Sequence, residues 1–312
     1  MKALVLGRGK SGEAAAALLR SRGAEVAFAD GYDLVVASPG LAVKSELQLG
    51  CEELKRRGVK MLAVTGSKGK SSVVKLVADA LGGVPCGNYG LPVSEVGETQ
   101  WAVVEVSSFM LETTALAPDT FEAAAILNLQ EDHLDRHGSA EVYHALKRRL
   151  LTMTRHPILP PEEATVPEQA KGSYFDNEVL GGNAAVAVEL MRAAGLDAAA
   201  IRAAFLGFVP LPHRMNEVAV IDGVRYVDDS KATSLAALAA GVRMCAGSVR
   251  LIAGGRPKGD DPKSVLSVLT KRVKKVYLIG ESAEVFSKAW DGAVDCEICD
   301  TLGRAIESAR RD

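Results

Sequence analysis

The segment Lys60-Met61-Leu62-Ala63-Val64-Thr65-Gly66-Ser67-Lys68-Gly69-Lys70-Ser71-Ser72 joins an apolar strand to a glycine loop that opens a helix. Glycine lets a backbone approach phosphate oxygens without a clash at Cβ, and N–H groups at a helix N-terminus favour an anion. Lys70 adds a point charge for the β- and γ-phosphates, and the Ser71 hydroxyl can bind Mg²⁺. The segment therefore predicts an ATP site that uses Gly66, Ser67, Lys68, Gly69, Lys70, Ser71 and Ser72.

The spacing of this loop differs from that of the usual phosphate loop, because position 64 is Val rather than Gly. A simple glycine turn that caps the helix would also explain Gly66 and Ser67. It would not explain two lysines around a glycine at a helix N-terminus, where positive charge is locally unfavourable. Phosphate binding is therefore the preferred interpretation.

Short apolar strands alternate with longer helical patterns along almost the whole chain, which predicts an α/β fold with parallel sheets. We expect three domains, over residues 1–59, 60–207 and 208–312. The pattern predicts strands at 3–6, 25–29, 33–37, 60–64, 101–106, 123–128, 249–253, 275–279 and 293–298, and helices near 11–22, 72–81, 183–194, 234–244, 263–273, 282–289 and 301–311. Strands 218–221 and 224–227 are expected to form a hairpin around Asp222-Gly223, a pair that favours a type I′ turn. The stretch 157–167, which carries four prolines, is expected to be a loop.

The composition excludes several classes of protein. An apolar share of 48% and a charged share of 24% are ordinary for a globular protein, and a net charge of −2 with 5% aromatics gives no support to a nucleic-acid partner. The five cysteines have irregular spacing, so neither a disulfide framework nor a zinc site is predicted. We see no signal peptide and no apolar stretch long enough to span a membrane, so we expect a cytoplasmic protein.

A second glycine loop, Gly7-Arg8-Gly9-Lys10-Ser11-Gly12, follows the first strand and opens a helix. Such a loop suits a diphosphate, which a dinucleotide or a nucleoside-diphosphate sugar would both supply. Asp30, near the end of the second strand, would suit a ribose. The loop alone leaves both readings open.

A single carboxylate, Glu105, interrupts the buried-looking strand Trp101–Val106. A buried carboxylate needs a metal or a partner, whereas an edge strand would leave it in solvent. Loops at the carboxyl ends of parallel strands meet at one edge of a sheet, so Glu105 and His133 are expected beside the phosphate loop, as Mg²⁺ ligands. We expect Asp135, Arg136 and His137 to be the solvated polar start of a helix.

Longer motifs resemble the Mur ligases, in the order of that family and over nearly the whole chain. They are Thr65–Ser72, Val104–Glu112 and Asn128–Asp135, with Ala37–Gly40, Gly87–Pro92 and Asp229–Thr233 closest to the members that join D-glutamate to UDP-N-acetylmuramoyl-L-alanine. The resemblance implies a Rossmann-like N-terminal domain for the UDP-sugar, a central P-loop ATPase domain with a mostly parallel sheet, and a Rossmann-like C-terminal domain for the amino acid. It implies an amide-bond-forming acid–amino acid ligase of peptidoglycan synthesis, and hence of cell-wall biogenesis, cell shape and cell division. It also implies a monomer that uses ATP, two Mg²⁺ ions and an acyl-phosphate intermediate.

The resemblance also implies roles for particular residues. Position by position, Lys70, His133 and Lys147 match catalytic residues; Ser71, Glu105, His133 and a carbamylated Lys147 match metal ligands; Asn183, His213, Arg214 and Asp229 match the ATP side; Lys10, Ser11, Asn88, Ser107, Lys231, Thr233 and Lys258 match substrate-side positions. By residue type alone, Lys147 would be expected in solvent on a helix.

The chain departs from the family pattern in three places. Its first domain is short between Pro39 and Lys60, and a glycine-x-histidine-asparagine element is reduced to Leu180-Gly181-Gly182, which affects the expected adenine contacts. The family continues beyond the position of Asp312 with a strand and a serine loop that grips the amino acid, so we expect the third domain to be incomplete. A degenerate binding protein, a ligase like folylpolyglutamate synthase, and a nicotinamide dehydrogenase are the alternatives. Binding of UDP, folate or NAD would distinguish them.

Overall fold

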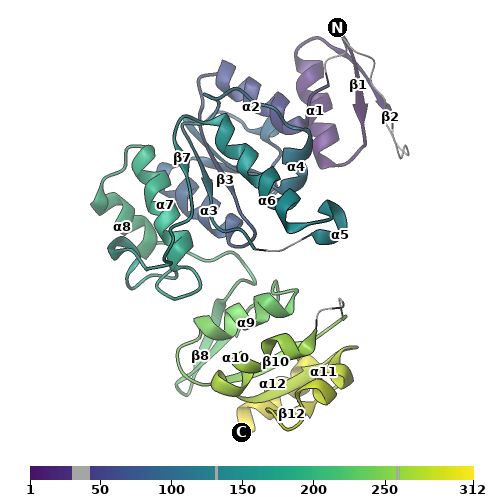
Figure 1. Cartoon of the computed structure of the whole chain (residues 1–312), viewed down its shortest axis with the longest axis vertical. Helices are drawn as coiled ribbons and strands as arrows, with labels where there is room; N and C mark the ends of the chain where they lie inside the picture. The colour runs from purple at the N-terminus through teal and green to yellow at the C-terminus, as the bar shows by residue number, and fades with distance from the viewer. Residues whose placement is uncertain (30–42, 131–132, 258, 260) are drawn as a thin grey trace. The chain divides into compact units, whose positions relative to one another are not determined.

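The computed structural model describes residues 1–29, 43–130, 133–257, 259 and 261–312. The strand predicted at 33–37, Asp30, the motif at 37–40 and Lys258 lie outside the described residues. The chain forms two compact units, one of Met1–Asp176 with Leu180–Phe208 and one of Asn177–Val179 with Val209–Asp312 (Figure 1). The division into three domains stays a prediction.

The chain begins with a parallel pair of strands, β1 (Lys2–Leu6) and β2 (Glu25–Ala29), joined by α1 (Lys10–Ser21). Helix α1 requires glycine at position 12, because a Cβ there would lie 2.1 Å from the carbonyl oxygen of Gly7 in the loop after β1. The predicted strand–loop–helix–strand order is confirmed here.

Five parallel strands form the central sheet of the first unit in the order β4-β5-β3-β6-β7. Their bounds are Val84–Gly87 for β4, Trp101–Glu105 for β5, Lys60–Thr65 for β3, Ala123–Ile126 for β6 and Pro157–Ile158 for β7. The short strand β7 replaces the start of the predicted loop, at an edge of the sheet where proline is tolerated. Val64 pairs with Glu105 and Thr65 with Ile126, so the loops after β3, β5 and β6 leave the sheet at one edge.

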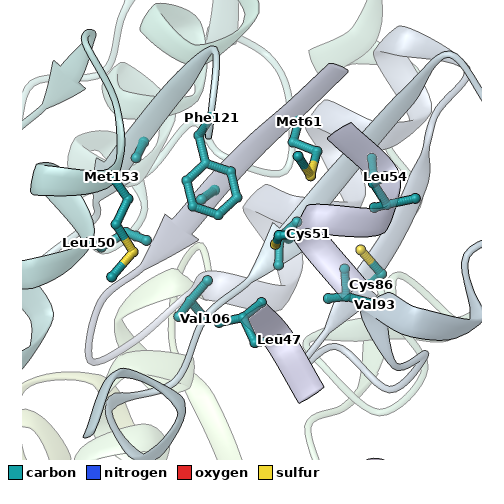
Figure 2. Packing of buried hydrophobic residues seen from close by; sticks show 14 of the residues in the cluster. Leu47, Cys51, Leu54, Met61, Cys86, Val93, Val106, Phe121, Leu150 and Met153 are labelled. Carbon is teal, nitrogen blue, oxygen red and sulfur yellow. The ribbon is translucent and has the colours of Figure 1, made fainter. Parts of the chain in front are cut away.

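A helix that the sequence did not predict, α2 (Glu46–Arg56), covers part of this sheet. Leu47, Cys51 and Leu54 project from it into an apolar cluster with Met61 of β3 and with Phe121, which precedes β6 (Figure 2). Gly50 weakens the helical pattern in the sequence, but a Cβ there would lie only 2.7 Å from the backbone nitrogen of Ser94. Close packing therefore explains the glycine. Helix α2 packs its apolar side chains against the central sheet although it precedes residue 60, where the second domain is expected to begin.

Further helical segments of the first unit surround the sheet, and α3 packs against α7 and α8 (Figure 1). These segments include α3 (Lys70–Leu81), η1 (Val93–Glu95), α4 (Ser108–Thr113), α5 (Leu134–His137), α6 (Ala140–Arg149), η2 (Leu150–Met153), η3 (Glu168–Ala170), α7 (Gly181–Ala193) and α8 (Ala198–Leu206).

Glu53 of α2 offers a test of how this unit is held together. It is 7% exposed and pairs with Arg22 and Arg56, and the hydrogen bond from Arg56 contributes most to lowering its pKa to about 2. A carboxylate whose pKa is lowered by folding stabilises the fold above its unfolded pKa of about 4.3, and this contribution is lost as the pH falls towards the folded value.

We expect Glu53→Gln to lower the free energy of unfolding by about 2 kcal/mol at neutral pH. The difference between the two proteins should shrink as the pH falls below about 5, because the parent carboxylate then becomes protonated. Urea unfolding at a series of pH values measures both effects. A difference that stays constant down to the acid limit would contradict this account of Glu53.

The second unit opens with an antiparallel hairpin of β8 (Asn216–Ile221) and β9 (Val224–Asp228). Asp222 and Gly223 both have positive φ, of 51° and 77°, as a type I′ turn requires, so the predicted hairpin is confirmed. A parallel sheet of order β10-β11-β12 follows. Its elements are β10 (Val249–Gly254), β11 (Val273–Ile279) and β12 (Asp295–Ile298), with α9 (Leu235–Met244), η4 (Pro262–Val265), α10 (Leu266–Arg272), α11 (Ala283–Trp290) and α12 (Leu302–Arg311).

The predicted α/β class with parallel sheets is thus confirmed in both units. Among the described residues, no helix combines the length and the apolar character needed to cross a membrane.

Candidate functional site

The predicted phosphate loop lies between the end of β3 and the start of α3. Gly66 and Gly69 have φ values of 150° and 84°, and Gly69 is the N-cap of α3. A Cβ on Gly69 would lie 2.1 Å from the Nδ2 atom of Asn183, and one on Gly66 would lie 3.0 Å from the Cβ of Leu127. The two glycines are therefore required by backbone conformation and by close protein neighbours, before any ligand is considered.

Lys70 folds back over this loop. Its Nζ donates to the carbonyl oxygens of Gly66 at 2.9 Å and of Ser67 at 3.2 Å. The ammonium group thus lies at the edge of the sheet where the loops after β3, β5 and β6 converge. Lys68 is exposed and Ser72 is buried at the start of α3. The loop places positive charge and a helix N-terminus together, which suits a polyphosphate.

Glu105 ends β5 and is only 2% exposed. The strand lies between β4 and β3, so the alternative of a solvated edge strand is wrong. The carboxylate accepts hydrogen bonds from the Ser71 hydroxyl and the Asn88 amide, each at 2.8 Å. The structure therefore brings together three of the residues predicted for the site, from α3, β5 and the loop after β4.

The oxygen atoms of Ser71 and Glu105 suit Mg²⁺ beside a triphosphate. In such sites Mg²⁺ is bound by one or two carboxylates, by substrate phosphates and by water. One buried carboxylate with a hydroxyl beside it is therefore enough for the protein to contribute. In the part of the chain that is described, no three His, Cys, Asp or Glu side chains are grouped to hold a metal ion. The arrangement fits an ion that phosphate helps to bind, rather than a cage made by protein alone.

Lys147 lies inside the first unit, not in solvent, which corrects the expectation from its residue type. It is 1% exposed, and its Nζ donates to the Gly66 carbonyl oxygen at 2.9 Å and lies 4.4 Å from the ring centre of Tyr143. Tyr143, one turn earlier on α6, donates its hydroxyl proton to the Ser67 hydroxyl at 3.2 Å. Helix α6 thus contacts the phosphate loop through both side chains.

His133 is exposed and has a positive φ of 52°. Its ring lies edge-on to Phe109, with 5.1 Å between the ring centres. His133 precedes α5, and its backbone carbonyl oxygen accepts hydrogen bonds from the N–H groups of Arg136 and His137. Its predicted role as a metal ligand stays a prediction.

The expectation that His137 is solvated is wrong. Its side chain is 2% exposed, shares a 3.0 Å hydrogen bond between Nε2 and the Ser108 hydroxyl, and places Nδ1 3.4 Å from Glu112. A carboxylate only accepts, so a proton belongs on Nδ1. Arg136 also pairs with Glu112, at 2.8 Å. These contacts join α5 to α4, and only His137 and Ser108 are buried among their members. A four-residue helix is too short for its sequence pattern to predict which side is buried.

We expect His137→Leu to lower the free energy of unfolding by about 2 kcal/mol, because the buried Ser108 hydroxyl loses its partner. Arg136→Leu is the matched control, since its exposed ion pair with Glu112 should contribute under about 1 kcal/mol. Chemical denaturation of the two variants provides the comparison. Equal losses of stability in the two variants would contradict a larger contribution from the buried hydrogen bond between His137 and Ser108.

The other substrate-side residues of the first unit lie on α1 and at the start of α4. Lys10 donates from its Nζ to the carbonyl oxygen of Gly90, and Ser11 is exposed on α1. Ser107 caps α4, where its hydroxyl accepts from the Met110 N–H at 3.3 Å. The capping contact gives Ser107 a structural role beside any contact with a substrate.

The remaining predicted residues belong to the second unit and cluster where β9 leads into α9. The Met215 N–H donates to Asp229 at 3.0 Å, and burial raises the pKa of that carboxyl. His213 lies 2.6 Å from Asp228, and its carbonyl oxygen accepts from the Lys231 N–H. Arg214 follows His213 in the chain, and Thr233 follows Lys231 in the segment between β9 and α9.

Three residues that hydrogen-bond to the phosphate loop had no role assigned from the sequence, Asn128, Gln130 and Tyr143. Tyr143 precedes Lys147 by four residues, so the two share a helix face, and this spacing could have indicated it. Asn128 follows β6 at the edge where ligands bind in parallel sheets, which is a weaker signal.

Comparison with known proteins gives a consistent result. Residues 64–160 match the Mur ligase middle domain. A UDP-N-acetylmuramoylalanine–D-glutamate ligase from Acidobacterium capsulatum is 31% identical in an alignment that covers 99% of this chain and 88% of that protein. The alignment extends over 421 positions although the chain has 312 residues, so parts of the relative have no counterpart here.

Solved structures show the same fold at lower identity. MurF from Acinetobacter baumannii has a TM-score of 0.63 and 18% identity, and the match covers 99% of this chain and 83% of that one. MurF ligase from Thermotoga maritima, in complex with ADP, has a TM-score of 0.57 and 16% identity, with 99% of this chain and 93% of that one covered. At these identities the likeness concerns the fold alone.

Proposed function

This chain belongs to the Mur ligase family, and on that premise we propose that it joins D-glutamate to UDP-N-acetylmuramoyl-L-alanine with consumption of ATP, in peptidoglycan precursor synthesis. The observation that carries the ATP-dependent part is the Ser71–Glu105 pair beside the phosphate loop. The choice of D-glutamate is supported by the name of the relative from Acidobacterium capsulatum.

The reaction would have two chemical steps. A carboxylate oxygen of the UDP-sugar peptide attacks the γ-phosphorus, ADP leaves, and an acyl phosphate forms. The amine of D-glutamate then attacks the carbonyl carbon, the tetrahedral intermediate expels phosphate, and the nitrogen loses a proton to leave the amide. Both steps build up negative charge on oxygen, so cations fixed in advance accelerate them.

Residues of the first unit would take the roles on the phosphate side. Lys70 would bind the β- and γ-phosphates, and the loop at 66–69 would orient them. Ser71 and Glu105 would hold one Mg²⁺, whose positive charge polarises the phosphoryl group when it is bound. We further propose that His133 and a carbamylated Lys147 hold a second Mg²⁺, because carbamylation turns a buried amine into an anionic oxygen ligand.

The remaining roles follow the domain division that we propose. The loop at 7–12 would bind the diphosphate of the UDP-sugar, with Lys10 and Ser11, while Asn88 and Ser107 would contact the substrate near the carboxylate. Asn183 would act on the ATP side from α7, and His213, Arg214 and Asp229 would do so from the second unit. Lys231, Thr233 and Lys258 would lie on the amino-acid side.

The direct test is ATP-dependent phosphate release by the full chain with substrates supplied singly and together. We expect phosphate release and ligated product only when UDP-N-acetylmuramoyl-L-alanine and D-glutamate are both present. A panel of other amino acids in place of D-glutamate tests the specificity. Phosphate release that is unaffected by leaving out either substrate would rule out the proposal, and binding without turnover would favour a degenerate binding protein.

A further inference from the structure

Asn128 follows β6 and makes four hydrogen bonds with its side chain. Its Oδ1 accepts from the backbone N–H groups of Ser67 at 3.1 Å and Lys68 at 2.8 Å. Its Nδ2 donates to the carbonyl oxygen of Lys68 at 2.9 Å and to Oδ1 of Asn183 at 3.0 Å. The geometry uses both sides of the amide, and a carboxylate of the same size could not donate.

These bonds fix the part of the phosphate loop between its two glycines. The Ser67 N–H also donates to the backbone carbonyl oxygen of Asn128, at 3.1 Å. Gly66 and Gly69 leave the backbone on either side of Ser67 and Lys68 with much conformational freedom in the absence of outside contacts. Asn128 therefore supplies a constraint that the loop sequence itself lacks.

Asn183 supports the same loop from another element. It lies on α7, is 5% exposed, and places Nδ2 where a Cβ of residue 69 would be. The hydrogen bond between Asn128 and Asn183 thus closes a continuous set of contacts around the loop, from the end of β6 through α7 to Gly69. Each contact lies on the protein side and can be made without a nucleotide.

We propose that Asn128 is a positioning residue that holds the phosphate loop in its nucleotide-binding conformation. It acts through Ser67 and Lys68 and does not itself take part in phosphoryl transfer. The identity of the nucleotide as ATP rests on the proposed function. Because the loop is ordered before the ligand arrives, the free energy of binding does not have to offset the entropy lost in ordering it.

Two substitutions separate this role from a general loss of stability. Asn128→Ala removes all four side-chain hydrogen bonds. Asn128→Asp keeps the acceptor for the Ser67 and Lys68 N–H groups, loses both donated bonds, and adds a negative charge beside the phosphate loop. The Ser67 N–H keeps the backbone carbonyl oxygen of residue 128 as an acceptor in both variants, so the Lys68 amide reports on the side chain. We expect hydrogen exchange at the Lys68 amide to become fast in Asn128→Ala and to stay slow in Asn128→Asp. ADP binding should weaken in both.

The measurements are amide exchange by NMR without nucleotide, ADP binding by titration calorimetry, and the KM values of the three substrates, all on the full chain. We expect the Kd for ADP to rise about tenfold in Asn128→Ala, as the loss of one or two net hydrogen bonds implies, and at least as much in Asn128→Asp. The KM for ATP should rise in parallel, whereas those of the UDP-sugar peptide and D-glutamate should not. Gln48→Ala, which removes an amide bonded to Glu52 on α2, is the control and should leave ADP binding unchanged.

An unchanged Kd for ADP in folded Asn128→Ala would overturn the inference. If neither variant folds, the parent decides, because fast exchange at the Lys68 amide would overturn the inference and slow exchange there would support it. A parent protein that binds ADP, is weakened by Asn128→Ala and forms no ligated product would overturn the proposed function and leave the inference standing. A parent that binds no ADP would overturn both.

Discussion

Glu105→Gln is expected to lower ATP-dependent phosphate release about a thousandfold while the protein stays folded. The amide has the same shape and can still accept from Ser71 or Asn88, but it lacks the negative charge that a divalent cation requires. Losing several kcal/mol of electrostatic stabilisation corresponds to about three factors of ten in rate. The rate of phosphate release with both substrates, and thermal unfolding of the two proteins, measure the effect.

The control for this substitution is Glu122→Gln. Glu122 is an exposed carboxylate just before the first residue of β6, at the end of the strand opposite to the phosphate loop. We expect it to retain the activity of the parent. If Glu105→Gln also retained full activity, the assignment of the Ser71–Glu105 pair to Mg²⁺ would be wrong, and the chain would be better explained as a degenerate binding protein.

Lys70→Met is expected to reduce the turnover rate a hundredfold or more. Methionine keeps the apolar part of the side chain, but it removes the charge that would stabilise the transferring phosphoryl group. The loss should fall mainly on kcat, because that charge matters most in the transition state. Steady-state kinetics with ATP as the varied substrate separate kcat from KM.

Lys75→Met is the matched control on the same helix. Lys75 forms an ion pair with Asp79 on α3 and lies over the ring of Phe208, so its removal should affect stability slightly and turnover hardly at all. Comparable losses in the two variants would indicate that α3 tolerates no such substitution, and would remove the support for a special role of Lys70.

Local patterns in the sequence predicted the parts of this fold that depend on neighbouring residues. The β3–loop–α3 unit follows from an apolar strand, two glycines and a helical repeat, and the hairpin follows from Asp222-Gly223. Helix α2 was missed because Gly50 and the charged residues around it obscure the repeat, and only the close approach of Ser94 explains the glycine.

The parts of the site that the sequence could not predict depend on contacts between distant segments. Lys147 and Gly66 are 81 residues apart, and nothing in a helix bearing three consecutive basic residues shows which one turns inward. His137 was expected in solvent because its partners, Ser108 and Glu112, lie on a different helix. The residue pattern predicted the role of Glu105 and the resemblance to a family supplied that of Lys147, but the contacts that hold both come from the structure.

In the proposed ligation, one oxygen of the substrate carboxylate passes to the released phosphate. The most direct test of this transfer uses UDP-N-acetylmuramoyl-L-alanine labelled with ¹⁸O in the alanyl carboxylate, incubated with ATP, D-glutamate and the full chain. Mass spectrometry of the released phosphate should find one labelled oxygen in each phosphate formed from fully labelled substrate, in step with the ligated product. Product with phosphate that carries no label would contradict the acyl-phosphate route, and labelled substrate recovered unchanged with no product would contradict ligase activity itself.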